Sequence, residues 1–110
     1  RLVDFATLLL QAPQHYLLDE PTNHLDLKYQ QLLLSKSKAL AAQGKTVIIS
    51  TPDINLANRY CDKVLMLFGN GVSIMGKTEM ALQQEQLETL YQCRIKKITQ
   101  KEQHYWLHEV

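Results

Sequence analysis

Hydrophobic and polar residues follow two different spacings along the chain, and segments of each kind alternate. Helical spacing predicts helices at residues 2–11, 26–43, after Pro52 and after Thr78. Short apolar or β-branched runs predict strands at residues 15–18, 46–50, 64–68 and 72–75. Residues 93–110 alternate polar and apolar side chains, which predicts a hairpin. This order predicts an α/β fold, with parallel strands and flanking helices first and antiparallel hairpins on the C-terminal side.

Two of the predicted helices have recognisable starts and an apolar face. Asp26 is a suitable N-cap for the first, and Gly44 a suitable stop. Its expected buried face is Tyr29, Leu32, Leu33 and Leu40. Thr78 is the expected N-cap of the second helix. The expected buried face of that helix is Met80, Leu87, Leu90 and Tyr91.

Length and composition limit the classes of protein to consider. At 110 residues we expect one small domain at most, and a composition of 45% hydrophobic and 21% charged residues is ordinary for a globular protein. The net charge of +1 gives no argument for nucleic acid or an anionic membrane surface. No apolar run approaches the ~20 residues that span a bilayer. Cys61 and Cys93 lack a metal-ligand spacing and indicate reduced, partly buried thiols.

GVSIMGKT, residues 71–78, matches the phosphate-loop pattern G-x-x-x-x-G-K-[ST]. Asn70-Gly71 is nevertheless a strong hairpin signal, and the β-branched Val72 and Ile74 suit a strand better than a loop around phosphate. Glu79 would also place a carboxylate at the helix start where an anion should bind. We therefore expect a hairpin with its turn at residues 69–71.

Two adjacent carboxylates, Asp19 and Glu20, follow an apolar run in HYLLDEPTNHLDL. Like charges beside a core are costly unless a cation or water compensates them. The carboxyl end of a strand in an α/β sheet is also where ligands bind. The pair is therefore a candidate site for a cation or ligand, and it resembles a Walker B pair, in which the Asp helps to hold Mg²⁺ on a nucleotide and the next acid positions the attacking water. LLDE alone is a weak signal for such a pair.

The surrounding residues resemble the ATP-binding subunits of ABC transporters. LLDEPTNHLDL is similar to their Walker B motif and D-loop, and TVIISTPDINLANRYCDKVLMLFGNGVSIMG to their H-loop strand, the next helix and a closing hairpin. The resemblance implies that residues 1–110 form the C-terminal part of one ABC ATPase domain of the P-loop NTPase class. DINLANRYCDKVLML and LETLYQCRIKKI favour the importers of iron chelates, haem and cobalamin. The soluble translation factors of the family, which share DEPTNHLD, remain the alternative branch.

The resemblance also implies roles for individual residues. Glu20 is the implied catalytic residue, which positions the attacking water, and Asp19 the implied Mg²⁺ ligand, acting through water. The implied nucleotide-binding positions are Asp19, Asn23, His24, Asp26 and Pro52. Pro52 stands where the family has a histidine that contacts the γ-phosphate, and proline offers neither an imidazole nor an N–H donor.

The family's phosphate loop, Q-loop and signature motif precede Walker B, and none is present between Arg1 and Asp19. We therefore expect a fragment that does not bind or hydrolyse ATP alone, with an exposed sheet edge that favours self-association or marginal stability. A degenerate remnant acting only through protein interaction is the alternative. The implied partners are a membrane permease subunit and a second ATP-binding subunit, and the implied location is cytoplasmic, peripheral to the inner membrane.

Two features of the C-terminal segment have simpler explanations than a ligand site. His104 and His108 could share one face of a strand, but no third metal ligand lies near them in the sequence. The basic stretch RIKK, residues 94–97, is short and the overall charge is balanced. We expect solvated strand faces at both places, and no nucleic-acid partner.

Overall fold

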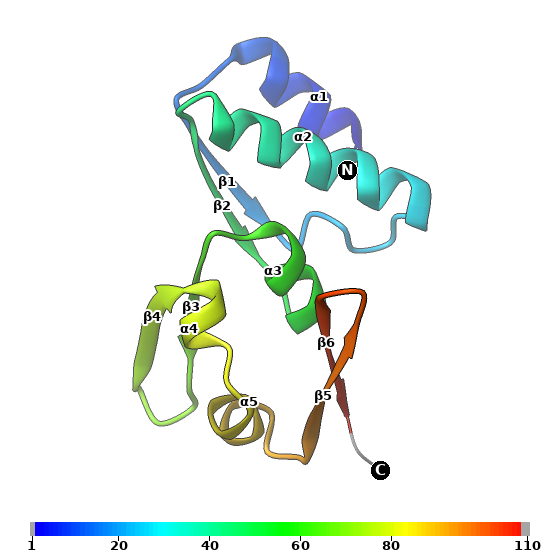
Figure 1. Cartoon of the computed structure of the whole chain (residues 1–110). Helices are drawn as coiled ribbons and strands as arrows, with labels where there is room; N and C mark the ends of the chain where they lie inside the picture. Colours follow the sequence, from blue (N-terminus) through cyan, green and yellow to red (C-terminus); the bar gives the residue numbers. More distant parts are fainter. Residues whose placement is uncertain (1, 109–110) are drawn as a thin grey trace. The chain divides into compact units, whose positions relative to one another are not determined.

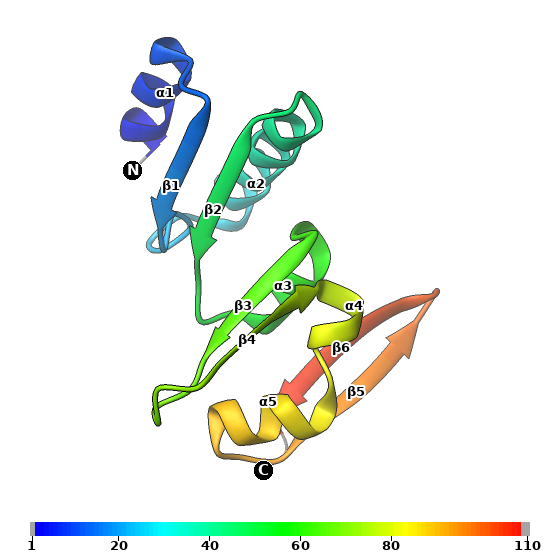
Figure 2. The ribbon, with the colours of Figure 1, turned by 90° about the vertical axis from the view of Figure 1, so that its left-hand side faces the viewer.

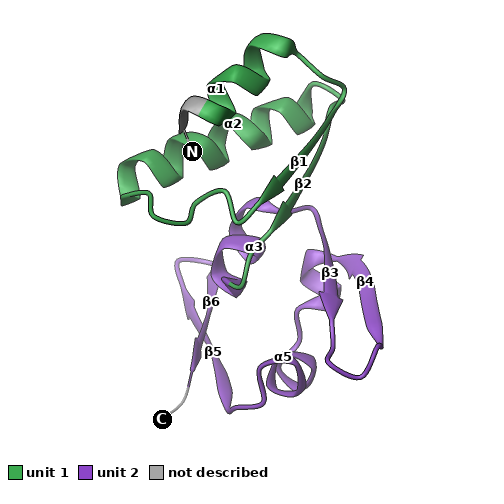
Figure 3. Cartoon of the chain, turned by 180° about the vertical axis from the view of Figure 1, so that it is seen from behind, with its two compact units in different colours: residues 1–52 green, residues 53–110 purple. Residues whose placement is uncertain are grey.

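A computed structural model describes residues 2–108 of the protein, with side chains from residue 4 onward. The chain forms two compact units, residues 1–52 and residues 53–110 (Figure 3). The boundary follows Pro52, the residue at which the sequence predicts the start of a helix. Each unit is described separately below.

The first unit contains two helices and a two-stranded parallel sheet (Figure 1). Its elements are α1 (Leu2–Gln11), β1 (His15–Asp19), α2 (Leu27–Ala42) and β2 (Thr46–Ser50). The two strands pair in register from His15 opposite Thr46 to Asp19 opposite Ser50. Phe5, Tyr16, Leu18, Leu33 and Leu34 are its buried apolar residues. The predicted elements and the parallel pairing are confirmed.

The other face of the parallel sheet is exposed within the first unit and carries two large apolar side chains. Leu17 of β1 and Ile48 of β2 are register partners, and both side chains are largely exposed. The alternation in β1 explains this, because Tyr16 and Leu18 point to the opposite, buried face. Strands with apolar residues on both faces are typical of parallel sheets that are covered on both sides.

The predicted apolar face of α2 is only partly correct. Leu33 is buried as expected, but Tyr29 and Leu32 are exposed, and Leu34 and Ser37 are buried instead. Leu32 is one helical turn from Lys36 and therefore lies on the charged side of the helix. Ser37 is accommodated in the buried face because its hydroxyl donates to the carbonyl of Leu33 at 2.9 Å.

The start of α2 is as predicted, since Asp26 is its N-cap and Oδ1 accepts a hydrogen bond from the backbone N–H of Tyr29 at 3.2 Å. Asp26→Ala is expected to lower the free energy of unfolding by about 1 kcal/mol, because a first-turn N–H loses its partner. Urea denaturation followed by far-UV circular dichroism measures the change. Asp26→Asn, which retains an acceptor oxygen, should cost much less, and equal losses in the two variants would contradict a capping role.

The second unit is built around two antiparallel hairpins (Figure 2). Its elements are α3 (Ile54–Tyr60), β3 (Lys63–Leu67), β4 (Ser73–Lys77), α4 (Thr78–Ala81), α5 (Gln84–Tyr91), β5 (Ile95–Gln100) and β6 (Gln103–His108). Its buried cluster is Met66, Ala81, Leu82, Leu87, Ile95 and Trp106. The predicted C-terminal hairpins are confirmed.

A side-chain amide joins α3 to the last strand. Asn55 Nδ2 donates to the carbonyl of Trp106 at 2.9 Å, and Asn55 Oδ1 accepts from the backbone N–H of Trp106 at 2.7 Å. The amide thus takes the place of a neighbouring strand along β6. Asn58, one turn further on, donates to the carbonyl of His104 at 2.9 Å.

Thr78 does not cap a helix, and the helix predicted after it is divided in two. Thr78 is the first residue of α4, with Lys77 in the N-cap position, and α5 begins at Gln84. The Thr78 hydroxyl donates instead to the carbonyl of Cys61 at 2.6 Å, so it is not available to a helix N–H. The division explains why Leu87 is fully buried while Met80, in the other helix, is 73% exposed.

Candidate functional site

The two adjacent carboxylates lie at the carboxyl end of the parallel sheet. Asp19 is the last residue of β1, and Ser50, its register partner, is the last residue of β2. Because the strands are parallel, their two carboxyl ends lie at the same end of the sheet. Asp19, Glu20 and Ser50 are all exposed at this edge.

Ser50 contacts both acidic residues. Its hydroxyl donates to Asp19 Oδ1 at 2.5 Å and accepts from the backbone N–H of Glu20 at 3.0 Å. The same Glu20 N–H also lies 3.0 Å from the Ser50 carbonyl oxygen. Glu20 has a φ of 41°, a conformation that non-glycine residues seldom adopt, so the chain turns sharply directly after Asp19. Ser50 was not predicted from the sequence as a site residue.

The loop between Glu20 and α2 is held by its own backbone. The N–H of Asn23 donates to the Glu20 carbonyl at 3.1 Å, and the N–H of Leu25 to the Thr22 carbonyl at 3.2 Å. His24 has a φ of 67°, and the side chains of Asn23 and His24 are exposed. Gln30 Nε2 donates to the Leu25 carbonyl at 2.8 Å, which ties the loop to the first turns of α2. Gln30 is a second residue that the sequence did not identify.

Pro52 is exposed and follows the end of β2 by two residues. Asp53, the next residue, caps α3 by accepting from the N–H groups of Asn55 and Leu56 at 3.0 and 3.2 Å. The fold therefore places position 52 between the strand that carries Ser50 and the following helix cap. The side chain at this position supplies no hydrogen-bond donor.

The oxygen donors at this edge suit a hard cation. Mg²⁺ prefers oxygen ligands and retains several of its waters, so a carboxylate such as that of Asp19 is an appropriate ligand through water. The Ser50 hydroxyl donates a hydrogen bond to one oxygen of that carboxylate. The residues present therefore fit a Mg²⁺ ion.

The segment that matches the phosphate-loop pattern is a hairpin, as predicted. The Phe68 N–H donates to the Val72 carbonyl at 2.9 Å, and Gly71 has a φ of 84° in the turn between them. Gly76 lies within β4, and the Thr78 side chain is buried. Residues 71–78 therefore do not wrap backbone N–H groups around an anion.

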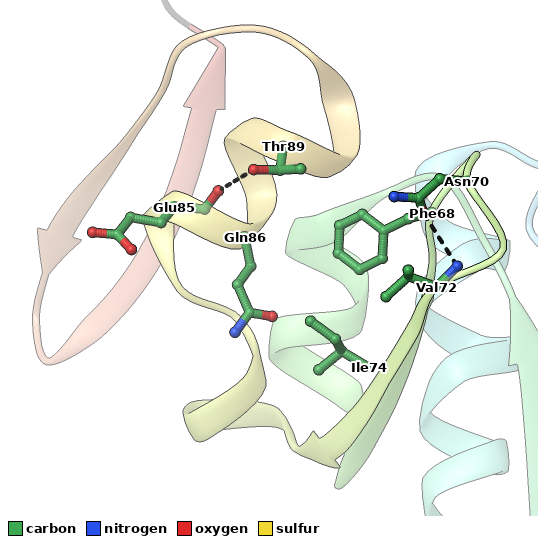
Figure 4. A pocket seen from close by; sticks show the side chains of 7 residues that line it. All are labelled: Phe68, Asn70, Val72, Ile74, Glu85, Gln86 and Thr89. Carbon is green, nitrogen blue, oxygen red and sulfur yellow. Dashed lines mark hydrogen bonds between the residues drawn. The ribbon is translucent and has the colours of Figure 1, made fainter.

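A pocket lies in the second unit, between the β3–β4 turn and α5 (Figure 4). Its volume is about 320 Å³, and it is lined by Phe68, Asn70, Val72, Ile74, Glu85, Gln86 and Thr89. The side chains of Phe68, Val72 and Ile74 form an apolar wall, and Thr89 is satisfied by the carbonyl of Glu85 at 3.0 Å. This pocket shares no residue with the pair of acids in the first unit.

Other titratable groups of the described chain form no second reactive cluster. No group of three or more metal-ligating side chains occurs within residues 2–108, and His104 Nδ1 is 2.9 Å from the Thr99 hydroxyl. Burial and the Asp53 carboxylate both raise the pKa of Tyr91, so this phenol stays protonated at neutral pH.

None of the helices in the described part of the chain has the length and apolar character needed to cross a membrane.

Several known proteins with similar sequences are ATP-binding proteins of importers. A hemin import ATP-binding protein of Pseudomonas fluorescens is 38% identical over 74% of this chain and 32% of its own length. One from Aliivibrio fischeri is 36% identical over 81% of this chain and 36% of its own length. A vitamin B12 import ATP-binding protein of Vibrio campbellii is 34% identical over 84% of this chain and 36% of its own length.

A solved structure gives the same result for the fold. An inward-facing metal-chelate type ABC transporter superposes with a TM-score of 0.85 and 26% identity, covering 99% of this chain and 46% of that chain. No family model matches the sequence. The chain spans about a third of the length of the curated relatives that it matches. Over most of its length, therefore, the chain resembles the ATP-binding proteins of ABC importers, in the branch that includes hemin and vitamin B12 import.

Proposed function

We propose that the chain is part of the ATP-hydrolysing machinery of an ABC importer for an iron chelate, haem or cobalamin. The observation that carries this proposal is the Asp19–Glu20 pair at the carboxyl end of β1, beside the parallel strand β2. Parallel α/β sheets bind ligands at this edge. The similarity to hemin and vitamin B12 import proteins supports both the nucleotide and the class of cargo.

In this proposal the two acids have separate roles. Asp19 would hold Mg²⁺ through water, and Glu20 would orient the water that attacks the γ-phosphate. Bound Mg²⁺ would neutralise charge on the phosphates and so favour transfer of the γ-phosphoryl group to water, with ADP as the leaving group. The exposed Asn23, His24 and Asp26 of the following loop lie on the nucleotide side, at the interface with a second ATP-binding subunit.

The proposed assembly contains more than this 110-residue chain. A phosphate loop and a signature motif must be supplied by other parts of the ATPase, and a membrane permease subunit couples hydrolysis to import. The exposed Leu17 and Ile48 side chains support a partner that packs on this face of the sheet, and the unpaired backbone at the sheet edge supports self-association. The proposed location is the cytoplasmic face of the inner membrane.

A second function is favoured by one specific residue. Pro52 removes the imidazole that the family resemblance places against the γ-phosphate. A subunit with this change would hold its position in an assembly while hydrolysing ATP slowly. Its contribution would then be protein interaction rather than catalysis.

Nucleotide binding tests the proposed function. The 110-residue chain alone is expected to give no saturable signal with a fluorescent ATP analogue at micromolar concentration, with or without Mg²⁺, because residues 71–78 form a hairpin. Mixed with the part of a hemin import ATP-binding relative that this chain does not match, it should give Mg²⁺-dependent binding stronger than either piece gives alone. Asp19→Asn is the matched control and should weaken the Mg²⁺-dependent gain. A mixture that binds no better than the relative's piece alone would overturn the proposal.

A further inference from the structure

The hydroxyl of Ser50 stands between the two acidic residues of the site. It donates to Asp19 Oδ1 at 2.5 Å and accepts the Glu20 N–H at 3.0 Å. A hydroxyl has one proton to give and two lone pairs to accept with. An ionised carboxylate only accepts and a backbone N–H only donates. The Ser50 O–H must therefore point toward Asp19, with a lone pair of its oxygen directed at the Glu20 N–H.

We propose that Ser50 is a positioning residue for the acid pair: it fixes the rotamer of the Asp19 carboxylate and the turn of the chain at Glu20. This inference rests on the proposed function, in which both acids act on a Mg²⁺-nucleotide. The residue itself touches neither the metal nor the nucleotide in this assignment. It acts through the two groups that do.

The position of Ser50 in the sheet explains why it can take this role. It is the register partner of Asp19 across the parallel pair β1–β2. Its side chain points to the same face of the sheet as that of Asp19, since register partners in a sheet share a face. An alanine or valine in this place would keep the strand but offer neither a donor nor an acceptor to the acids.

The Ser50 hydroxyl also stabilises the strained backbone at Glu20. Glu20 has a φ of 41°, which costs conformational energy that local hydrogen bonds must offset. Its N–H is shared between the Ser50 carbonyl oxygen and the Ser50 hydroxyl, each at 3.0 Å. Removing the hydroxyl takes away one acceptor of this N–H, so the turn that directs the Glu20 side chain loses one of its supports.

Two variants of nearly the same shape isolate the hydroxyl. Ser50→Thr retains it, Ser50→Val lacks it, and both β-branched residues suit a strand. NMR of the 110-residue chain measures two quantities in each: the Hα–Hβ couplings that report the χ1 rotamer of Asp19, and the hydrogen-exchange rate of the Glu20 amide. Neither measurement needs nucleotide, so its outcome is independent of whether the proposed function holds.

The wild-type chain and Ser50→Thr are expected to show one Asp19 rotamer. In Ser50→Val the couplings should average over several rotamers, and the Glu20 amide should exchange about fivefold faster, the factor expected for one hydrogen bond open to competing water. Thr46→Ala, on the same exposed face of β2, is the control and should change neither quantity. The proposal is overturned if Ser50→Val retains the wild-type couplings and exchange rate, if Asp19 already averages over rotamers in the wild-type chain, or if Ser50→Thr fails to retain the wild-type values.

Discussion

Leu87→Ala is expected to lower the free energy of unfolding of the second unit by about 3 kcal/mol. Leu87 is 0% exposed and packs in the cluster with Met66, Ile95 and Trp106, so truncation removes buried apolar surface and leaves a cavity. The chain has one tryptophan, and it lies in this same cluster. Urea denaturation followed by Trp106 fluorescence therefore reports the affected core directly.

Leu65→Ala is the matched control for this prediction. Leu65 lies on β3 of the same unit but is 56% exposed, so the same substitution there should change the free energy of unfolding by less than about 0.5 kcal/mol. Similar losses in the two variants would show that the Leu87 cluster is not the core of the unit.

The helices and strands follow from the sequence wherever local signals are complete. Asp26 as N-cap defines the start of α2, and β-branched residues define β2. The prediction fails at Thr78, because nothing local shows that its hydroxyl bonds to the Cys61 carbonyl, 17 residues earlier in the chain. It also fails for Leu32 and Leu34, since the buried side of α2 depends on what the helix packs against.

The same distinction applies to the candidate site: residues that are adjacent in the sequence could be predicted, and residues brought together by folding could not. Asp19 and Glu20 are adjacent in the sequence, and their position after an apolar run makes them candidates without any knowledge of the fold. Ser50 is 31 residues from Asp19 and comes beside it only through the register of the parallel strands. The polar residue that ends TVIIS was nevertheless a usable signal, because parallel strands place their carboxyl ends at one edge. Gln30 gave no such signal, since a glutamine near a helix start is ordinary.

Pro52→His is expected to raise ATP hydrolysis by about 10²–10³-fold when residues 15–60 replace the matched segment of a hemin import ATP-binding relative. Histidine offers a ring N–H where the resemblance places a contact with the γ-phosphate, and proline has neither that ring nor a backbone N–H. Steady-state hydrolysis by the two chimeras, at saturating Mg²⁺-ATP, measures the difference. The effect should fall on kcat, because the contact strengthens as charge develops on the transferred phosphoryl group.

Two controls separate the imidazole from other consequences of removing proline. Pro52→Ala restores a backbone N–H and relaxes the chain without adding a ring, so it should leave hydrolysis near the low level of the Pro52 chimera. Glu20→Gln in the Pro52→His chimera should abolish the recovered activity, because a neutral amide positions the attacking water less well than the carboxylate. If Pro52→Ala and Pro52→His raised hydrolysis equally, the proline restriction on the backbone, and not the missing imidazole, would be what limits the reaction. A Pro52 chimera as fast as the intact relative would mean that this site needs no imidazole, and that Pro52 does not distinguish a catalytic subunit from a non-catalytic one.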